Sequence, residues 1–348
     1  MASCAHVEWL QLCQDQKELS IVYGARLRKL VEGMTRARTQ YPSLLFFVGK
    51  KTKTRALRAL FPENNHTRRR GHGIANLHID SITADTEKPI LFADADLEGG
   101  LVEQSGILCH CHEITRYRID WADERDPTKD IMNKLYARLF FAFTDVLCLF
   151  AEDCGGLDGV TERLRSWVNI GPGSSMIRPR VVIVTTQEPK PDYGCFAELL
   201  PDLSRSFSAV KVVNLLDIAD VSSTARHIPL KDALLREADV ARRARINDRT
   251  LFSAIHLRAF FDRALRQTAA TVSDPFDFVH ASRERNEVDS RFSLHLSAFL
   301  RLCLDDEISL DSIASFVASA TLMDAFPPGM HRKPPDPRTV RKLTSLRL

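Results

Sequence analysis

The chain has 348 residues, of which 44% are hydrophobic and 27% charged, a globular composition long enough for one large domain or two ordinary ones. Its 48 lysines and arginines nearly balance 45 aspartates and glutamates, so the formal charge of +3 gives no global field for nucleic acid, and we expect no such partner. No apolar run reaches the roughly 18 residues of a membrane span, and residues 1–19 lack a signal-peptide core, so we expect an intracellular, cytoplasmic protein.

Residues 1–40 are predicted to form an N-terminal helical segment. Within this stretch, apolar residues such as Trp9 and Ile21 recur at roughly helical spacing between charged residues. The Tyr41-Pro42 pair ends the pattern, because the residue before a proline avoids the helical conformation.

Residues 41–228 are predicted to form an α/β domain. Apolar runs typical of buried strands occur at 44–48, 89–93, 146–151, 180–184 and 210–216, and residues 74–79 alternate apolar and polar side chains as an edge or half-covered strand would. Helical patterns separate them at 54–61, 130–140, 157–168 and 195–203. Because strands alternate with helices, the sequence predicts three layers around a mostly parallel sheet of the P-loop NTPase type.

Residues 229–328 are predicted to be an all-helical region. Long helical periodicity covers 230–268 and continues at 292–304, and Ser309 is a suitable N-cap for a last helix. The remaining residues, 329–348, form a basic, proline-rich tail. The helical region is a candidate surface for a protein partner.

A candidate phosphate-binding loop follows the first strand of the α/β domain. The stretch PSLLFFVGKKTKTRALRALFP (42–62) resembles the strand–GxxxxGK[ST]–helix pattern, in which backbone amides and a lysine hold phosphates. The loop is two residues short, and Thr52 replaces the second glycine. The residues predicted to bind the nucleotide here are Gly49, Lys50, Lys51, Thr52, Lys53 and Thr54.

Acidic residues at the end of a later strand complete the predicted site. Asp94 and the Thr54 hydroxyl would hold Mg²⁺, while Lys53 would contact the β- and γ-phosphates. The run from Asp96 to Gly99 fits DxxG, so the Gly99 amide is expected to sense a γ-phosphate. The expected ligand is Mg²⁺ with ATP or GTP.

Base selection and catalysis are not supported by any motif. Guanine-specific proteins carry [NT]KxD after a late strand, whereas this chain has Thr185-Thr186-Gln187-Glu188 there. No arginine finger or water-positioning glutamine can be assigned, so no catalytic residue is named. Any NTP hydrolysis is expected to be slow.

Three segments resemble a known group of fungal proteins. They are LFFAFTDVLCLFAEDCGGLDGVTERLRSW (139–167), PRVVIVTT (179–186) and FVASATLMDAFPPGMH (316–331). They look like the N-terminal region of large proteins in which a degenerate, GTPase-like P-loop domain and a helical segment precede a patatin-like phospholipase. The resemblance implies a regulatory nucleotide-binding module. It implies no lipase, because the chain has no GxSxG motif.

Two main hypotheses follow. The first is a degenerate P-loop module that binds a nucleoside triphosphate, with weak or no hydrolysis, and acts as a regulatory switch. The alternative is a pseudo-NTPase scaffold that binds a partner protein through 229–328. A third hypothesis, a metal-dependent hydrolase, places Asp94, Asp96 and Asp153 around one metal.

Other notable segments have ordinary interpretations. The eight cysteines are scattered, which favours reduced thiols, and Cys109-His110-Cys111-His112 has no second ligand pair for zinc. Cys154 is a candidate reactive thiol without an evident partner histidine. Asp153-Cys-Gly-Gly, after a central strand, is either part of a ligand site or a tight turn. Arg68-Arg69-Arg70 is either a mobile switch loop or a solvated connection.

Overall fold

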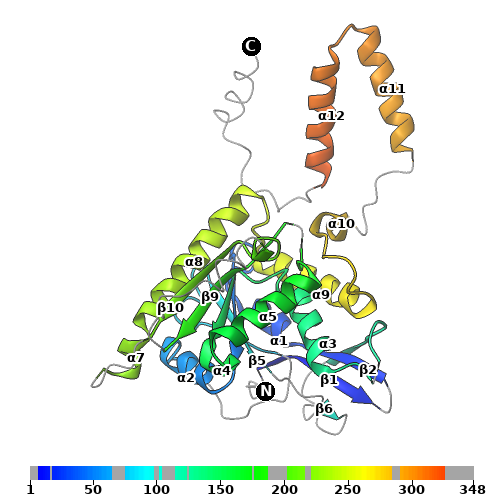
Figure 1. Ribbon diagram of the computed structural model, residues 1–348. Coiled ribbons are helices and arrows are strands. Elements are labelled where there is room, and N and C mark those ends of the chain that lie inside the picture. Colours follow the sequence, from blue (N-terminus) through cyan, green and yellow to red (C-terminus); the bar gives the residue numbers. More distant parts are fainter. Residues whose placement is uncertain are drawn as a thin grey trace. The chain divides into compact units, whose positions relative to one another are not determined.

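The structure, a computed structural model, describes residues 7–15, 18–64, 75–97, 102–103, 114–123, 125–174, 176–186, 202–215, 221–283 and 291–325. The chain divides into two compact units, Met1–Phe276 and Asp277–Leu348. The first unit contains a large sheet with helices against it, and the second is helical (Figure 1).

The sheet has a parallel half and an antiparallel half. Its strands are β1 (Glu8–Asp15), β2 (Glu18–Gly24), β3 (Ser43–Gly49), β4 (Ala75–Ile79), β5 (Ile90–Asp96), β6 (Val102–Glu103), β7 (Ile114–Arg118), β8 (Val146–Phe150), β9 (Arg180–Thr185) and β10 (Ala209–Asn214). The order is β10-β9-β8-β3-β5-β4-β1-β2-β7, with β6 beside β1. From β10 to β5 every pairing is parallel, and from β5 to β7 every pairing is antiparallel. The predicted α/β fold is therefore confirmed, but the sheet is mostly parallel only in the half that carries the candidate loop.

The prediction of a helical segment over 1–40 is wrong. Two antiparallel strands, β1 and β2, precede one short helix, α1 (Arg26–Gly33), and β1 also pairs with β4. The apolar residues that imitated a helical period, such as Trp9 and Ile21, are buried strand residues. A strand that is covered on both faces loses its alternating pattern, so its spacing does not exclude a helix.

Helices cover both faces of the sheet. One layer contains α2 (Lys51–Leu60) and α8 (Ile228–Asn247), whose apolar faces join Leu45 and Phe47 of β3 in one core. On the opposite face, Phe46 stacks on Phe140 with ring centroids 4.9 Å apart. Neighbouring residues of β3 thus point to opposite cores, which explains the uninterrupted apolar run of this strand.

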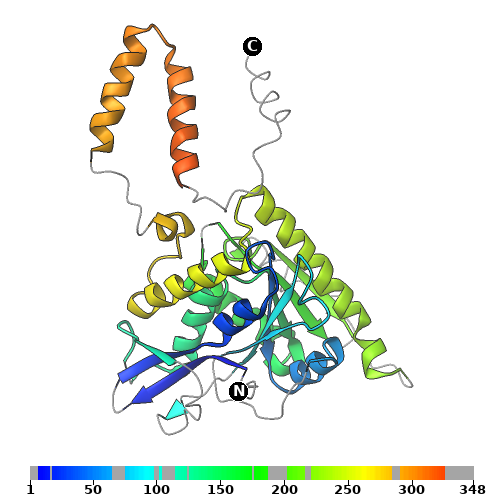
Figure 2. The same cartoon turned by 180° about the vertical axis from the view of Figure 1, so that it is seen from behind.

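The second helical layer is rich in aromatic residues. It contains α1, α3 (Thr128–Leu135), a π-helical turn η2 (Tyr136–Phe140), α5 (Leu157–Ile170) and α9 (Ala254–Ala270). Trp9 of β1 packs on Phe261 of α9 at 4.4 Å, and Trp167 of α5 packs on Phe141 at 5.1 Å between ring centroids. Seen from behind, α1 lies beside α9 (Figure 2). Two short helices complete the unit: α4 (Ala151–Cys154) directly follows β8, and α7 (Ser223–Arg226) directly precedes α8.

The predicted boundary between the α/β domain and the helical region, at residues 228 and 229, is wrong. Leu230 and Leu234 of α8 belong to the core beside β3, and Arg245 Nε lies 2.5 Å from Asp145 Oδ1 near the start of β8. Both α8 and α9 complete the α/β unit, which ends at Phe276. These helices pack on strands far away in the sequence, a contact that helical periodicity does not reveal.

The second unit is all-helical, as the sequence predicted for this part of the chain. It contains α10 (Phe278–Arg283), α11 (Phe292–Asp305) and α12 (Leu310–Ala325). The predicted N-cap is present, since Ser309 Oγ accepts a hydrogen bond from Ser312 N at 3.3 Å. The basic tail at 329–348 lies outside the described residues. Within the ranges described above, no helix combines the length and apolarity that crossing a membrane requires.

Candidate functional site

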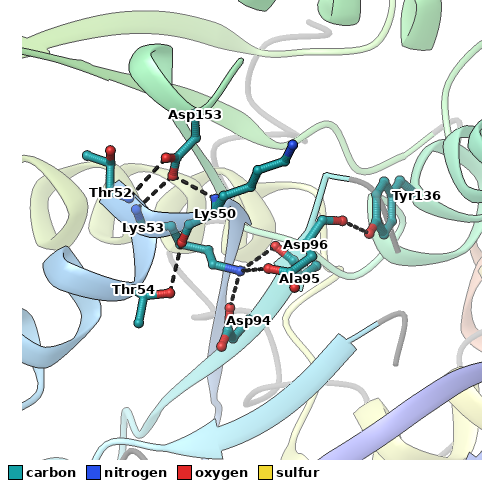
Figure 3. A network of polar contacts seen from close by, with 9 residues as sticks. All are labelled: Lys50, Thr52, Lys53, Thr54, Asp94, Ala95, Asp96, Tyr136 and Asp153. Atoms are coloured by element: carbon teal, nitrogen blue, oxygen red, sulfur yellow. Dashed lines mark hydrogen bonds and ion pairs between the residues drawn. The ribbon is translucent and has the colours of Figure 1, made fainter. Parts of the chain in front are cut away.

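The candidate loop lies at one edge of the parallel half of the sheet. β3 ends at Gly49 and leads directly into α2, while β5 ends at Asp96, the register partner of Gly49. β8, on the other side of β3, leads into α4, which carries Asp153. Because the carboxyl ends of parallel strands meet at one edge, residues from three separate segments converge here (Figure 3).

The Asp153 carboxylate accepts hydrogen bonds from backbone amides of the loop. Its Oδ2 accepts hydrogen bonds from Lys50 N at 2.7 Å and Lys53 N at 2.9 Å, and its Oδ1 accepts one from Thr52 N at 2.9 Å (Figure 3). Lys50, at the N-cap position of α2, provides no side-chain cap. The carboxylate therefore caps α2 from a different part of the chain, in the position where the helix dipole and exposed amides favour an anion.

The same hydrogen bonds keep Asp153 charged. Burial alone would raise the pKa of this carboxyl group, but the backbone amides of Lys53, Thr52 and Lys50 outweigh it and hold the pKa below its ordinary value. At neutral pH the loop therefore contains a permanent internal anion.

Gly49 makes room for this carboxylate. A Cβ atom at Gly49 would lie 2.7 Å from Asp153 Oδ2 and 2.9 Å from Lys53 Cβ. Real Cβ atoms do not approach their neighbours so closely, so glycine is needed at the end of β3 to bring the carboxylate onto the loop.

The ammonium group of Lys53 is paired with acidic and carbonyl groups of β5. Its side chain is only 2% exposed, and its Nζ lies 2.5 Å from Asp94 Oδ1, 2.8 Å from Asp96 Oδ1 and 2.7 Å from the Ala95 carbonyl oxygen. The ammonium group thus donates hydrogen bonds to Asp96 and to the Ala95 carbonyl and forms an ion pair with Asp94. Tyr136 fixes the end of the strand by donating a hydrogen bond to the Asp96 carbonyl at 2.9 Å (Figure 3).

The other residues predicted to bind the nucleotide do not contact the Lys53 ammonium or the Asp153 carboxylate, or they lie outside the described residues. The Thr54 hydroxyl donates to the Lys50 carbonyl at 2.8 Å, and the Lys51 side chain is exposed on the outer side of α2. Gly99 is not among the described residues. In the part of the chain that the structure describes, no group of three His, Cys, Asp or Glu residues could hold a metal ion.

The arrangement does not fit a Mg²⁺–nucleotide complex. The amides of Lys50, Thr52 and Lys53 already have an anionic acceptor, and the Lys53 ammonium is enclosed by two carboxylates. The acids of the hypothetical hydrolase do not surround one metal either, because Asp94 and Asp96 hold Lys53 whereas Asp153 holds the loop.

Helix α4 connects the loop to the next strand. Glu152 Oε1 accepts hydrogen bonds from Thr186 N at 2.5 Å and Thr186 Oγ1 at 2.8 Å, just after β9. Gly155 and Gly156 then turn the chain into α5 with φ angles of 89° and 96°, in the region that favours glycine. The Asp153-Cys-Gly-Gly stretch is thus a tight turn whose aspartate also holds the loop after β3, and the preceding Glu152 connects α4 to the end of β9.

Cys154 is poorly suited to be a nucleophile. Burial is the largest influence on this thiol and, together with nearby Asp153 and Glu152, raises its pKa to about 11. The Cys109–His112 and Arg68–Arg70 segments lie outside the described residues.

The internal partners of the loop were missed by the sequence prediction. Asp153 lies 100 residues after Lys53, and only the placement of β8 beside β3 brings them together. The sequence did contain one signal for this contact: Asp153 closely follows the apolar run at 146–151. Residues that follow parallel strands lie at the same edge of the sheet as the loop, so this acid could have been predicted to lie near it.

Comparisons with known proteins leave the chain without a family. No protein-family model matches it, and no curated protein matches it. Among solved structures it is similar to the siderophore hydrolase EstA from Aspergillus nidulans, with a TM-score of 0.27 and 10% identity over 67% of this chain and 93% of that one. A TM-score this low supports no inference about fold or activity.

Proposed function

We propose that the Met1–Phe276 unit is a pseudo-NTPase: a P-loop-type α/β domain that keeps the architecture of a nucleotide-binding module and acts as a scaffold without nucleotide. The observation that carries this proposal is the Asp153 carboxylate on three loop amides. The fold supports it, because β3, the loop, α2, β4 and β5 follow one another in the order expected for a P-loop domain.

The energetic argument is that a triphosphate would have to displace groups that are already paired. Breaking a fully buried ion pair costs about 3–5 kcal/mol, and less here because the Asp94 and Asp96 side chains are 26% and 48% exposed. A cost of about 2–4 kcal/mol corresponds to roughly 30- to 1,000-fold weaker binding. The displaced Asp153, Asp94 and Asp96 would then lie close to the incoming phosphates and repel them. The first hypothesis, a nucleotide-controlled switch, is therefore less favoured by this geometry.

The regulatory role implied by the fungal resemblance would then depend on protein contacts. Helices α8 and α9 are used within the α/β core, which narrows the predicted partner surface to the second unit. There, large apolar side chains of α11, α12 and their connection are 42–69% exposed: Phe292, Leu294, Leu302, Leu304, Ile308, Leu310 and Phe316. Exposed apolar surface of this kind marks an interaction site, so we propose that α11 and α12 bind the protein partner.

The proposal is tested by thermal unfolding of the full chain with Mg²⁺ and ATP or GTP. We expect no stabilisation that depends on Lys53. A site with a Kd of about 10 μM would stabilise the wild type by about 2.7 kcal/mol at about 1 mM ligand. A nucleotide-induced shift of that size that disappears in Lys53→Ala would overturn the proposal.

A second variant tests whether Asp153 takes the place of a phosphate. Asp153→Ala uncovers the loop amides, so inorganic phosphate should stabilise this variant more than the wild type. Asp158→Ala is the matched control, because Asp158 is an exposed carboxylate in the first turn of α5. If phosphate shifts all three proteins equally, Asp153 does not fill an anion site and the proposal fails.

A further inference from the structure

A basic hollow lies on the outer side of α2, apart from the Lys53 network. It has a volume of about 570 Å³, and its described lining residues are Lys51, Thr54, Arg55, Arg58, Ala59, Ser223 and Thr224. The wall opposite α2 comes from α7, which lies beside α2 in both views (Figures 1 and 2).

Three cations of α2 face this hollow, and none of them has a counter-ion among the described residues. Lys51, Arg55 and Arg58 are exposed and spaced i, i+4 and i+7, so they share one face of the helix. Their side chains have no hydrogen bond or ion pair with any residue that the structure describes, and no carboxylate is among the described lining residues.

This charge arrangement is unfavourable for α2 itself. Lys51 and Arg55 are like charges one turn apart, a pairing that destabilises a helix. The Asp153 carboxylate already meets the amides at the start of α2, but it is not among the described lining residues of this hollow. An anion bound in the hollow would relieve the repulsion between Lys51 and Arg55.

The opposite wall supplies neutral donors. Ser222 caps α7 by accepting a hydrogen bond from Ala225 N at 3.2 Å. The hydroxyl groups of the next two residues, Ser223 and Thr224, are not needed for this cap. Both residues are exposed, and neither hydroxyl is hydrogen-bonded to a described residue. Hydroxyl groups beside arginines are suitable donors for phosphate oxygens.

We propose that this hollow binds a compact ligand that carries two or more phosphoryl groups. The backbone rises about 10 Å between Lys51 and Arg58, so the cationic face is longer than a single phosphoryl group. Arg55 and Arg58 offer planar, bidentate donors, and Lys51 adds a point charge. A soluble polyphosphate and a phosphorylated lipid headgroup share this chemistry. The site is separate from the blocked loop and goes beyond the proposed scaffold function.

Isothermal titration of the full chain with sodium tripolyphosphate tests the site. The double variant Arg55→Gln/Arg58→Gln should bind at least about tenfold more weakly than the wild type, because two charge-assisted contacts are lost. The matched control is Arg165→Gln/Arg266→Gln, which removes two exposed helical arginines from α5 and α9 on the other face of the sheet. Equal losses in the two double variants would overturn the proposal.

A second arm identifies the source of the phosphoryl groups. Phosphatidylcholine vesicles with and without a phosphatidylinositol bisphosphate replace tripolyphosphate in a sedimentation assay. Binding of either probe that Arg55→Gln/Arg58→Gln removes supports the site and names its source, whereas binding of neither overturns it. All four arginines are exposed, and unchanged thermal unfolding of the variants confirms that they are folded.

Discussion

Replacing Lys53 with methionine removes the charge from the centre of the network and keeps most of the side-chain volume. In the wild type the Lys53 ammonium forms ion pairs with both Asp94 and Asp96 and donates a hydrogen bond to the Ala95 carbonyl. In Lys53→Met the two carboxylates remain next to one another without a cation. We therefore expect the variant to be clearly less stable than the wild type.

The magnitude follows from the burial of the three charged groups. Removing one partner of a fully buried ion pair costs about 3–5 kcal/mol. Lys53 is 2% exposed, but the Asp94 and Asp96 side chains are 26% and 48% exposed, so water can solvate them after the change. We expect a loss of about 2–4 kcal/mol in the free energy of unfolding, and a fall in Tm of roughly 5–10 °C for a unit of this size.

Urea unfolding followed by tryptophan fluorescence measures this loss. All three tryptophans, Trp9, Trp121 and Trp167, lie in the α/β unit, so the signal reports on the unit that contains Lys53. Adding Asp94→Asn to Lys53→Met should recover part of the loss, because it removes the repulsion between the two acids.

A lysine kept available for a phosphate has no such structural role. Its replacement would change the free energy of unfolding by less than about 0.5 kcal/mol, as for other substitutions of side chains that lack internal partners. A change that small in Lys53→Met, with no effect of Asp94→Asn on it, would refute the internal neutralisation described here.

Two further predictions concern titration of groups in α4. The folded-state pKa of Asp153 is depressed below its ordinary value of 3.8, so its stabilising contribution is present above that value and is lost as the pH falls through the lower, folded-state pKa. The stability difference between wild type and Asp153→Asn should therefore be constant near neutral pH and shrink progressively as the pH falls below about 3.8 in acid unfolding experiments, and a difference that does not shrink with falling pH would contradict this. Cys154, with its pKa raised to about 11, should react with iodoacetamide at neutral pH at least about 100-fold more slowly than an ordinary thiol, as measured by mass spectrometry of its peptide. Rapid labelling of Cys154 at pH 7.5 would show that the thiol is more accessible than its surroundings indicate.

Local patterns predicted the parallel half of the sheet well. The runs at 44–48 and 146–151 correspond to β3 (Ser43–Gly49) and β8 (Val146–Phe150), and the helical pattern at 157–168 corresponds to α5 (Leu157–Ile170). Strands with both faces covered produce uninterrupted apolar runs that are bounded by glycine or acids, and this signal is contained in a few neighbouring residues. The position of the candidate loop was predicted for the same reason.

The antiparallel half and the attached helices were not predictable in this way. The spacing in β1 and β2 was compatible with a helix, and only their pairing with each other and with β4 and β7 makes them strands. Similarly, α8 and α9 have helical periodicity in the sequence, but their assignment to the first unit depends on contacts with strands formed much earlier in the chain.

The chemical state of the loop depends on long-range pairing. The sequence contains Lys53, Asp94, Asp96 and Asp153, and each could serve a nucleotide, a metal or another side chain. The parallel register of β5, β3 and β8 brings the ends of these strands to one edge, where the acids reach the lysine and the amides before any ligand does. Residue types and local spacing specify which charges are present, but strand order and register determine which of them neutralise each other, because electrostatic pairing depends on distance in space.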